Sequence, residues 1–281
     1  MRHALALGQR GWGNTWPNPA VGCVIVHGSR IIGRGWTQPG GRPHAEPMAL
    51  AQAGAKARGA TAYVTLEPCA HHGQTPPCAD ALIAAGIARV VSATTDPDPR
   101  VSGRGHAALR QAGISVTEAV AETEAHRANA GFFLRMQSNR PHVTLKLATT
   151  LDGRIAMADG TSRWITGPQA RRMVHMLRLQ RDAVMVGIGT ALADDPDLTV
   201  REMGAVRQPV RVVVDRALRL PLTSRLVQSA GQVPVWLCHG DATGPAPLQT
   251  LSQAGARLIQ CAAVGQTLDL RSEERRVGKE C

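Results

Sequence analysis

Aromatic side chains and lysine are both scarce in this sequence. Phe, Trp and Tyr make up 3% of the residues, and lysine occurs only at Lys56, Lys146 and Lys279, so arginine carries almost all of the net charge of +11. The charge is dispersed, because 14 basic and 8 acidic residues precede position 141, and 18 and 13 follow. Nucleic-acid binding usually combines a basic groove with aromatic residues on which bases stack. We therefore expect no nucleic-acid partner, whereas a small phosphorylated ligand is compatible with the arginine excess.

Long apolar runs and closely spaced cysteines are also missing. No stretch approaches the roughly 20 apolar residues that span a bilayer. The start, MRHALALGQRGWGN, has no apolar stretch long enough for a secretory signal. These observations favour a cytoplasmic protein without a membrane partner. Six cysteines spread over 281 residues are then better explained as thiols or metal ligands than as a disulfide framework.

The order of apolar segments predicts an α/β fold for the first 140 residues. Apolar runs rich in β-branched residues alternate with helical patterns that begin near proline and end at glycine. A sheet with helices on both faces accounts for this alternation. In chain order we expect strands at 20–28 and 30–36, a helix at 43–57, a strand at 60–67, a helix at 76–86, a strand at 88–95, a helix at 105–113, a strand at 114–120 and a helix at 121–137.

A second α/β domain is expected from residue 141. The segment SNRPH resembles a linker, and the pattern after it begins with an apolar alternation that is typical of a strand. The expected boundaries are 1–140 for the first domain, 141–270 for the second and 271–281 for a tail. In the second domain we expect a strand near 142–154, a helix at 168–180, strands at 182–190, 209–215 and 233–238, a helix at 247–255 and a strand at 256–262.

Two short segments contain the residue types that bind zinc. His44 stands in PHAE, and Cys69 and Cys78, each after a proline, stand in PCAHHGQTPPC. A catalytic zinc site uses three such ligands, so that a fourth position stays open. His44 is expected at a helix start, Cys69 after a strand and Cys78 in the first turn of a helix, at the edge where open α/β sheets bind ligands. The sequence therefore predicts a zinc site on these three residues.

Glu46 has a different expected role. Two residues along a helix correspond to about 200° of rotation, so Glu46 and His44 do not share a face. We expect Glu46 to transfer protons beside the metal. H-x-E with P-C-x-x-C is the signature of zinc nucleobase deaminases, although eight residues separate the cysteines here. A nucleic-acid or free-nucleobase deaminase would share these residues, and a structural zinc protein would add His71 or His72 as a fourth ligand. The other cysteines in strands, Cys23, Cys238 and Cys261, are expected in the core.

Several motifs in sequence order give the chain a resemblance to a known family. They are TWPNPAVGCVIV, GRPHAEPMAL, ATAYVTLEPCAHHGQTPPC, TTDPDPRVSGRG and LKLATTLDGRIA. Together they resemble the bifunctional deaminase-reductases of riboflavin biosynthesis, over about residues 1 to 215. The resemblance implies a cytidine-deaminase-like three-layer α/β/α domain followed by an incomplete dihydrofolate-reductase-like α/β domain. It also implies deamination of a phosphoribosylated diaminopyrimidine, followed by reduction of its ribosyl group with NADPH.

The resemblance also assigns roles to single residues. In the deaminase it implies zinc (Zn2+) on His44, Cys69 and Cys78, Glu46 as proton shuttle, and Asn18 of PNP on the pyrimidine. In the reductase it implies that Ser162, Arg178, Leu198 and Arg201 bind substrate, and that Ala148, Trp164, Thr190 and Asp194 bind NADPH. Two arginines offer bidentate donors suited to a phosphate. The alternative is that Arg178 and Arg201 are solvated surface charges.

A few residues depart from the family pattern. Thr37 stands where a histidine is expected, Gln74 where a basic residue is usual, and Pro47 where an aliphatic residue is common. The family pattern continues beyond this sequence, and the last residues, RSEERRVGKEC, break the α/β pattern. We therefore expect a competent deaminase joined to a weak or inactive reductase, with 271–281 as a non-native tail or a solvated helix. The oligomeric state stays open, and a homo-oligomer is compatible with the sequence.

Overall fold

The structure is a computed structural model of residues 1–281, described for all residues except 74, 163, 242–243, 266 and 270–281. The chain folds into two compact units, Met1–His142 and Val143–Cys281. Gln74 and the tail expected at 271–281 lie outside the described residues.

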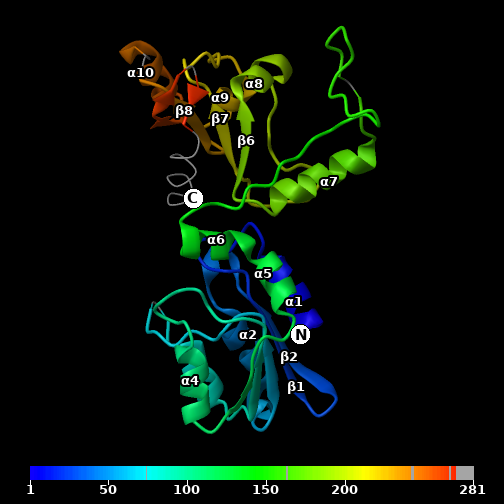
Figure 1. Ribbon diagram of the computed structural model, residues 1–281, viewed down its shortest axis with the longest axis vertical. Coiled ribbons are helices and arrows are strands. Elements are labelled where there is room, and N and C mark those ends of the chain that lie inside the picture. Colours follow the sequence, from blue (N-terminus) through cyan, green and yellow to red (C-terminus); the bar gives the residue numbers. More distant parts are fainter. Residues whose placement is uncertain (74, 163, 242–243, 266, 270–281) are drawn as a thin grey trace. The chain divides into compact units, whose positions relative to one another are not determined.

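The first unit contains a mixed five-stranded sheet in the order β2-β1-β3-β4-β5. Its neighbouring strands β1 and β2 are labelled in Figure 1. β1 pairs antiparallel with β2 and β3, whereas β3, β4 and β5 are parallel. The elements are α1 (Arg2–Gly8), β1 (Gly22–His27), β2 (Arg30–Trp36), α2 (Ala45–Ala53), β3 (Thr61–Val64), α3 (Cys78–Ala84), β4 (Arg89–Ser92), α4 (Arg104–Gln111), β5 (Ser115–Thr117), α5 (Glu122–Ala128) and α6 (Ala130–Ser138). Short 3₁₀ turns lie at Gln9–Gly11, Pro39–Gly41 and Gly54–Ala57. The sequence pattern did not predict α1.

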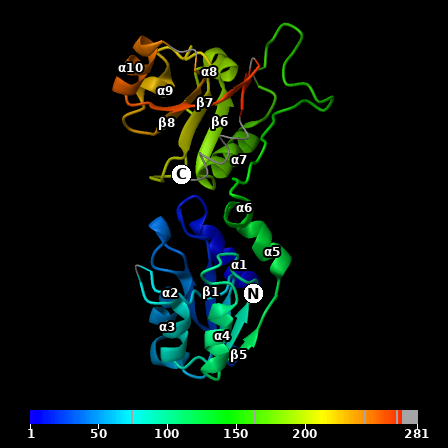
Figure 2. The same cartoon turned by 60° about the vertical axis from the view of Figure 1, so that its left-hand side comes forward.

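Helices cover both faces of this sheet (Figure 2). Along β1, Cys23 and Ile25 point into a core with α2, α3 and α4, whereas Val24 packs against Ala4 and Leu7 of α1. This alternation follows from the two-residue period of a strand, because successive side chains point to opposite faces. The three-layer α/β/α expectation is confirmed for the first unit.

The glycines of β2 permit an unusually close approach of α2. A Cβ atom at Gly33 would lie 2.2 Å from the carbonyl oxygen of Ala49, and one at Gly35 would lie 2.0 Å from that of Ala45. Only residues without a side chain fit at such distances. The first turn of α2 is therefore fixed against the sheet, directly after His44, which is its N-cap residue.

The second unit contains a parallel sheet in the order β6-β7-β8-β9 and a short antiparallel pair, β10 and β11. Its parallel strands and flanking helices confirm the expected α/β class. The elements are α7 (Pro168–Leu179), β6 (Ala183–Gly187), α8 (Ile188–Asp194), β7 (Val210–Val214), α9 (Arg225–Gln228), β8 (Val235–His239), α10 (Pro245–Gln253), β9 (Arg257–Gln260), β10 (Ala263–Val264) and β11 (Thr267–Leu268).

One expected strand of the second unit does not form, and another is shorter than expected. No strand forms at 142–154, where Val143, Leu145 and Leu147 are 66%, 79% and 63% exposed. An apolar alternation forms a strand only where a neighbouring strand accepts its hydrogen bonds. The strand expected at 182–190 ends at Gly187, where α8 begins. The sequence pattern also did not predict the short helix α9.

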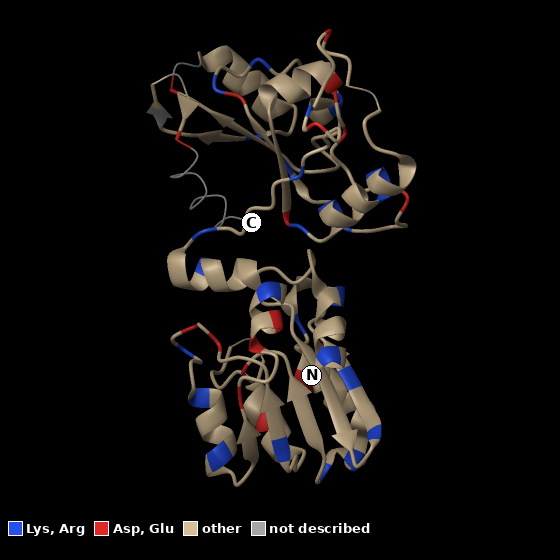
Figure 3. Ribbon diagram, turned by 45° about the vertical axis from the view of Figure 1, so that its right-hand side comes forward, with Lys and Arg blue, Asp and Glu red and all other residues tan. Residues whose placement is uncertain are grey.

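Among the described residues, the basic side chains are not gathered on a single element (Figure 3), and the helices include no detected membrane span. In the first unit, the basic residues are spread over several helices and strands (Figure 3). Within the described part of the chain, no helix has both the length and the apolarity required to cross a bilayer.

Candidate metal site and its surroundings

His44, Cys69 and Cys78 converge at one edge of the first sheet. His44 is the N-cap of α2, Cys78 is the first residue of α3, and Cys69 lies in the loop after β3. His44 Nδ1 lies 3.3 Å from Cys78 Sγ and 3.7 Å from Cys69 Sγ. All three candidate ligand atoms lie within 4.8 Å of one another. Three segments that are far apart in the sequence thus place one imidazole and two sulfurs around a common point.

These separations fit a tetrahedral zinc ion. With Zn–S and Zn–N bonds of about 2.3 and 2.0 Å, tetrahedral geometry places nitrogen and sulfur about 3.5 Å apart. The two measured N···S distances lie on either side of that value. Among the described residues, neither His71 nor His72 belongs to a metal-ligand cluster. The donor set therefore matches a three-ligand site with an open position.

Electrostatics at Cys69 also favour a metal cation, whereas the hydrogen bond with Cys69 and burial raise the pKa of the Cys78 thiol. Hydrogen bonds from the Cys78 thiol, from His44 and from the Cys78 backbone N–H lower the pKa of Cys69 to about 4, against the effect of burial. The backbone N–H of Cys78 lies 3.3 Å from Cys69 Sγ. The hydrogen bond with Cys69 also raises the pKa of His44. Cys69 is thus a thiolate near neutral pH, which is the form that binds metals.

Glu46 lies beside this cluster in the first turn of α2. Its side chain is buried, with only 4% of the residue exposed. Burial, followed by the negative charge of Cys69, raises the pKa of Glu46 to about 7. The positive charge of His44, two residues away, acts in the opposite direction. A carboxyl group with a pKa near the working pH can both accept and donate a proton.

Asn18 reaches the same place from the segment before β1. Its Nδ2 donates to the carbonyl oxygen of Gly41 at 2.7 Å and lies 3.4 Å from His44 Nε2. The structure therefore places the Asn18 amide against the metal-ligand cluster. Thr37, a departure from the family pattern, is buried, and its hydroxyl accepts the N–H of Val21 at 3.0 Å. In this chain Thr37 supports the backbone.

Sequence reasoning missed Glu67, a buried carboxylate two residues before Cys69. Its Oε2 accepts the N–H groups of Asp96 at 3.2 Å and Gly103 at 2.9 Å, and its Oε1 accepts those of Gly105 at 2.8 Å and His106 at 3.3 Å. It therefore caps the start of α4 and fixes the loop that precedes this helix. The available signal was an acidic residue at the end of an apolar strand segment, directly before Pro68.

Asp96 is a second acidic group in the same region. It is 7% exposed, and burial raises its pKa to about 7. The nearby charges of Asp98, Glu67 and Cys69 contribute in the same direction, whereas the N–H of Asp98, which Asp96 Oδ1 accepts at 2.8 Å, opposes them. An ionised Asp96 is thus costly for the folded state.

The expected reductase residues lie on four segments of the second unit. Arg178 donates to the carbonyl oxygen of Thr199 at 2.9 Å, Arg201 pairs with Asp197 at 2.7 Å, and Leu198 between them is buried in the core. Thr190 and Asp194 are exposed on α8. On the irregular stretch 143–167, Ser162 is exposed, Ala148 is half-buried, and Trp164, 71% exposed, lies 4.3 Å from the guanidinium of Arg171.

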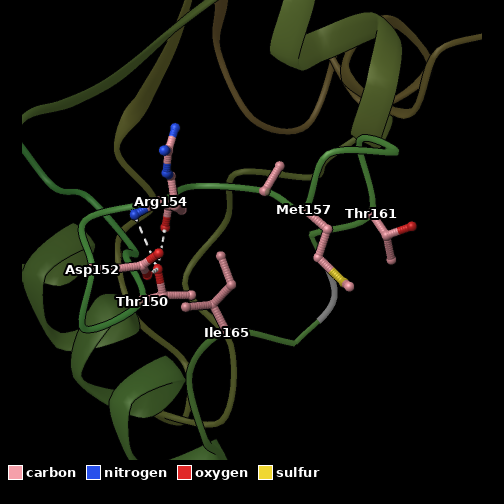
Figure 4. A pocket seen from close by; sticks show the side chains of 7 residues that line it. Thr150, Asp152, Arg154, Met157, Thr161 and Ile165 are labelled. Atoms are coloured by element: carbon pink, nitrogen blue, oxygen red, sulfur yellow. Dashed lines mark hydrogen bonds between the residues drawn. The ribbon is translucent and has the colours of Figure 1, made fainter.

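A hollow of about 200 Å³ lies on this irregular stretch (Figure 4). A turn forms one side, in which the Thr150 hydroxyl contacts Asp152 and accepts the N–H of Arg154 at 3.0 Å. None of the eight residues expected to bind the reductase substrate or NADPH lines it. Its lining residues are Thr150, Asp152, Arg154, Ala156, Met157, Thr161 and Ile165.

Comparisons with known proteins cover both units. The family model of the cytidine and deoxycytidylate deaminase zinc-binding region matches residues 1–94, and that of the RibD C-terminal domain matches residues 141–268. The riboflavin biosynthesis protein RibD of Escherichia coli is 52% identical over 244 residues, which cover 83% of this chain and 66% of the relative. That of Actinobacillus pleuropneumoniae is 44% identical over 282 residues, which cover 99% and 74%.

Solved structures of proteins from the same family also match this chain. Acinetobacter baumannii RibD matches with a TM-score of 0.85 and 42% sequence identity, over 99% of this chain and 76% of that chain. The chain spans 66% of the length of the E. coli relative and 64% of that of Aquifex aeolicus RibD. Both units are therefore similar to the corresponding parts of these longer proteins.

Proposed function

The chain belongs to the RibD family of riboflavin-biosynthesis proteins, and we propose that its first unit is a zinc-dependent hydrolytic deaminase. The proposed substrate is 2,5-diamino-6-(5-phosphoribosylamino)pyrimidin-4(3H)-one, and the product is 5-amino-6-(5-phosphoribosylamino)uracil. In this reaction a C–N bond breaks, water supplies the oxygen of the new carbonyl group, and ammonia leaves.

One observation carries the proposal: a three-donor cluster and a buried carboxyl group share one site. His44, Cys69 and Cys78 would hold zinc, which when bound supplies Lewis-acid activation of water at the open fourth position. A purely structural zinc site closes that position with a fourth protein ligand. The three-donor set in the described structure therefore favours catalysis over a structural role.

Glu46 and Asn18 supply the remaining chemistry. With a pKa of about 7, Glu46 can take a proton from the attacking water and return it to the departing amino group. Its burial keeps that proton from exchanging freely with solvent. The Asn18 amide carries a donor and an acceptor, which suits the polar edge of a pyrimidine ring. Its hydrogen bond to Gly41 fixes this amide before substrate binds.

We also propose that the second unit belongs to an NADPH-dependent reductase that acts on the deaminated product. The RibD C-terminal domain match supports this proposal. Exposed Trp164, next to Arg171, offers a flat surface against which a cofactor ring can stack. The other residues assigned to NADPH, Ala148, Thr190 and Asp194, lie on the irregular stretch and on α8. The positions of these residues do not specify a catalytic step of the reductase.

The test is to incubate the zinc-loaded protein with the diaminopyrimidine phosphoriboside and to follow ammonia release and NADPH oxidation together. We expect ammonia release by the wild type and its loss by a factor of at least about 10² in Glu46→Gln, because general acid-base groups contribute about 10² to 10⁴. Glu46→Gln should keep one zinc ion per chain, since the three ligands are intact. Equal activity of the variant and the wild type would contradict the role of Glu46.

The alternatives predict different results in the same assay. A structural zinc protein would release no ammonia, and His71→Ala or His72→Ala would release its metal. A nucleic-acid deaminase would act on oligonucleotides in a strongly salt-dependent manner. Release of ammonia from the phosphoriboside, with zinc retained by both histidine variants, supports the proposed function.

A further inference from the structure

The segment that carries Asn18 cannot hold itself in place by ordinary strand pairing. In the sequence Trp16-Pro17-Asn18-Pro19-Ala20, the two prolines have no backbone N–H and cannot donate to a ladder. Accordingly β1 begins only at Gly22. The N–H of Asn18 donates to Thr15 at 2.8 Å, which closes a turn but fixes nothing to the rest of the unit. Other groups must therefore fix this segment beside the metal site.

Asn129 supplies the missing partner from more than 100 residues away. Its Oδ1 accepts the N–H of Ala20 at 2.9 Å, and its Nδ2 donates to the carbonyl oxygen of Ala20 at 3.2 Å. A carboxamide carries the same donor and acceptor as a peptide group, so this side chain takes the place of a neighbouring strand. Asn129 is 7% exposed, which makes both hydrogen bonds costly to lose.

The backbone of Asn129 is itself firmly held. It lies between α5 and α6, its N–H donates to Ala125 at 3.2 Å, and its carbonyl oxygen accepts the N–H of Phe133 at 3.1 Å. Two residues after Phe133, Arg135 of α6 donates to the carbonyl oxygen of Pro17 at 2.8 Å, and its guanidinium lies 4.5 Å from the centre of the Trp16 ring. The α5–α6 pair thus holds the backbone on both sides of Asn18.

The next two residues of the chain are fixed in a similar way. The N–H of Val21 donates to the hydroxyl of Thr37, and that of Gly22 donates to the hydroxyl of Thr65, each at 3.0 Å. The three consecutive backbone N–H groups of residues 20 to 22 thus donate hydrogen bonds to buried side chains from three different segments of the chain. These hydrogen bonds restrict the conformation of the segment before β1, in which Asn18 Nδ2 lies 3.4 Å from His44 Nε2.

From these contacts we propose that Asn129 is a positioning residue of the deaminase site, which acts on the substrate through Asn18. The inference rests on the proposed function. It extends the site beyond residues 1–94, the part matched by the zinc-binding deaminase model, to the α5–α6 pair. Asn129 contacts neither His44 nor the two cysteines in the described structure, so its loss should leave the metal in place and weaken the contact between Asn18 and substrate.

A double-mutant cycle tests the coupling. We expect Asn129→Ala to lower kcat/KM roughly tenfold, mainly through KM, because a misplaced Asn18 loses about one hydrogen bond to substrate. Zinc content should stay at one ion per chain. In Asn18→Ala, whose side chain is already absent, the additional change Asn129→Ala should have little further effect on kcat/KM. Multiplying effects in the double variant would overturn the inference.

Two further variants separate positioning from general stability. Ser92→Ala removes another buried hydrogen bond, to His106 Nε2 at 2.8 Å, and should lower Tm without changing KM. Asn129→Gln keeps both a donor and an acceptor and should fall between Asn129→Ala and the wild type, which also covers the case that the alanine variant does not fold. An Asn129→Ala variant with reduced Tm and unchanged KM would overturn the inference.

Amide hydrogen exchange gives a readout that does not depend on activity. In Asn129→Ala or Asn129→Gln, the amides of Asn18 and Ala20 should exchange at least several-fold faster, whereas those of α2 should be unchanged. Unchanged exchange at these two positions would overturn the positioning role, whatever the activity. A wild type that releases no ammonia would instead overturn the proposed function alone, because the exchange experiment would still decide whether Asn129 holds Asn18.

Discussion

Replacing Asp96 by asparagine should stabilise the protein, and the gain should grow with pH. Burial raises the pKa of Asp96 from 3.8 to about 7. A carboxyl group whose pKa is raised on folding contributes stability at low pH, and this contribution is lost as pH rises from about 4 through 7. At 1.36 kcal/mol per pH unit, ionised Asp96 costs the folded state about 4 kcal/mol at pH 8 and above. An asparagine side chain at this position has no charge to bury and would keep the acceptor for the N–H of Asp98.

The assay is urea unfolding of the full chain, followed by circular dichroism between about pH 5 and pH 9. Because relaxation and water reduce such electrostatic costs, we expect Asp96→Asn to gain about 2 to 4 kcal/mol at about pH 9 and progressively less towards pH 5. Asp80→Asn, a change at an exposed carboxylate on α3, is the matched control. A gain of equal size across the pH range, or no gain at pH 9, would refute the electrostatic explanation.

Three further predictions follow from other contacts. Glu67→Gln leaves a side chain that accepts at one oxygen only, so we expect a loss of about 2 to 4 kcal/mol and faster hydrogen exchange in α4; unchanged exchange there would count against the capping role. Gly35→Ala introduces a Cβ 2.0 Å from the carbonyl oxygen of Ala45, so we expect a displaced α2 and weaker zinc binding through His44 in a metal titration, whereas Gly131→Ala, with only ordinary contacts, should bind zinc normally. Chelation of zinc should abolish ammonia release and re-addition should restore it; activity that persists in metal-free protein would refute the metal requirement.

Much of the first unit could be predicted from the sequence because its signals are local. Apolar strands, proline near helix starts and glycine at helix ends placed nearly every element within a few residues. His44, Cys69 and Cys78 could be grouped because the ends of neighbouring strands and the starts of the following helices meet at one sheet edge. Their convergence within 4.8 Å follows from that topology.

The supporting contacts could not be predicted, because they leave no periodic trace. Asn129 and Ala20 are 109 residues apart, and nothing in the local pattern of either residue identifies the other. Glu67 is similar, since its partners are backbone N–H groups that any residue would provide. At Leu145 the local pattern was misleading. It is typical of a strand, but no strand forms there, because no pairing partner is present among the described residues.

The base of the loop between the two cysteines is closed independently of the loop itself. The N–H of Ala79 donates to the carbonyl oxygen of Cys69 at 3.1 Å, and the N–H of Cys78 lies 3.3 Å from Cys69 Sγ. Because these two links hold Cys69 and Cys78 together, we expect exchange of the residues between them to leave the three-donor cluster in place. Variants in which this loop is replaced would thus separate the contribution of the loop from that of the candidate metal ligands.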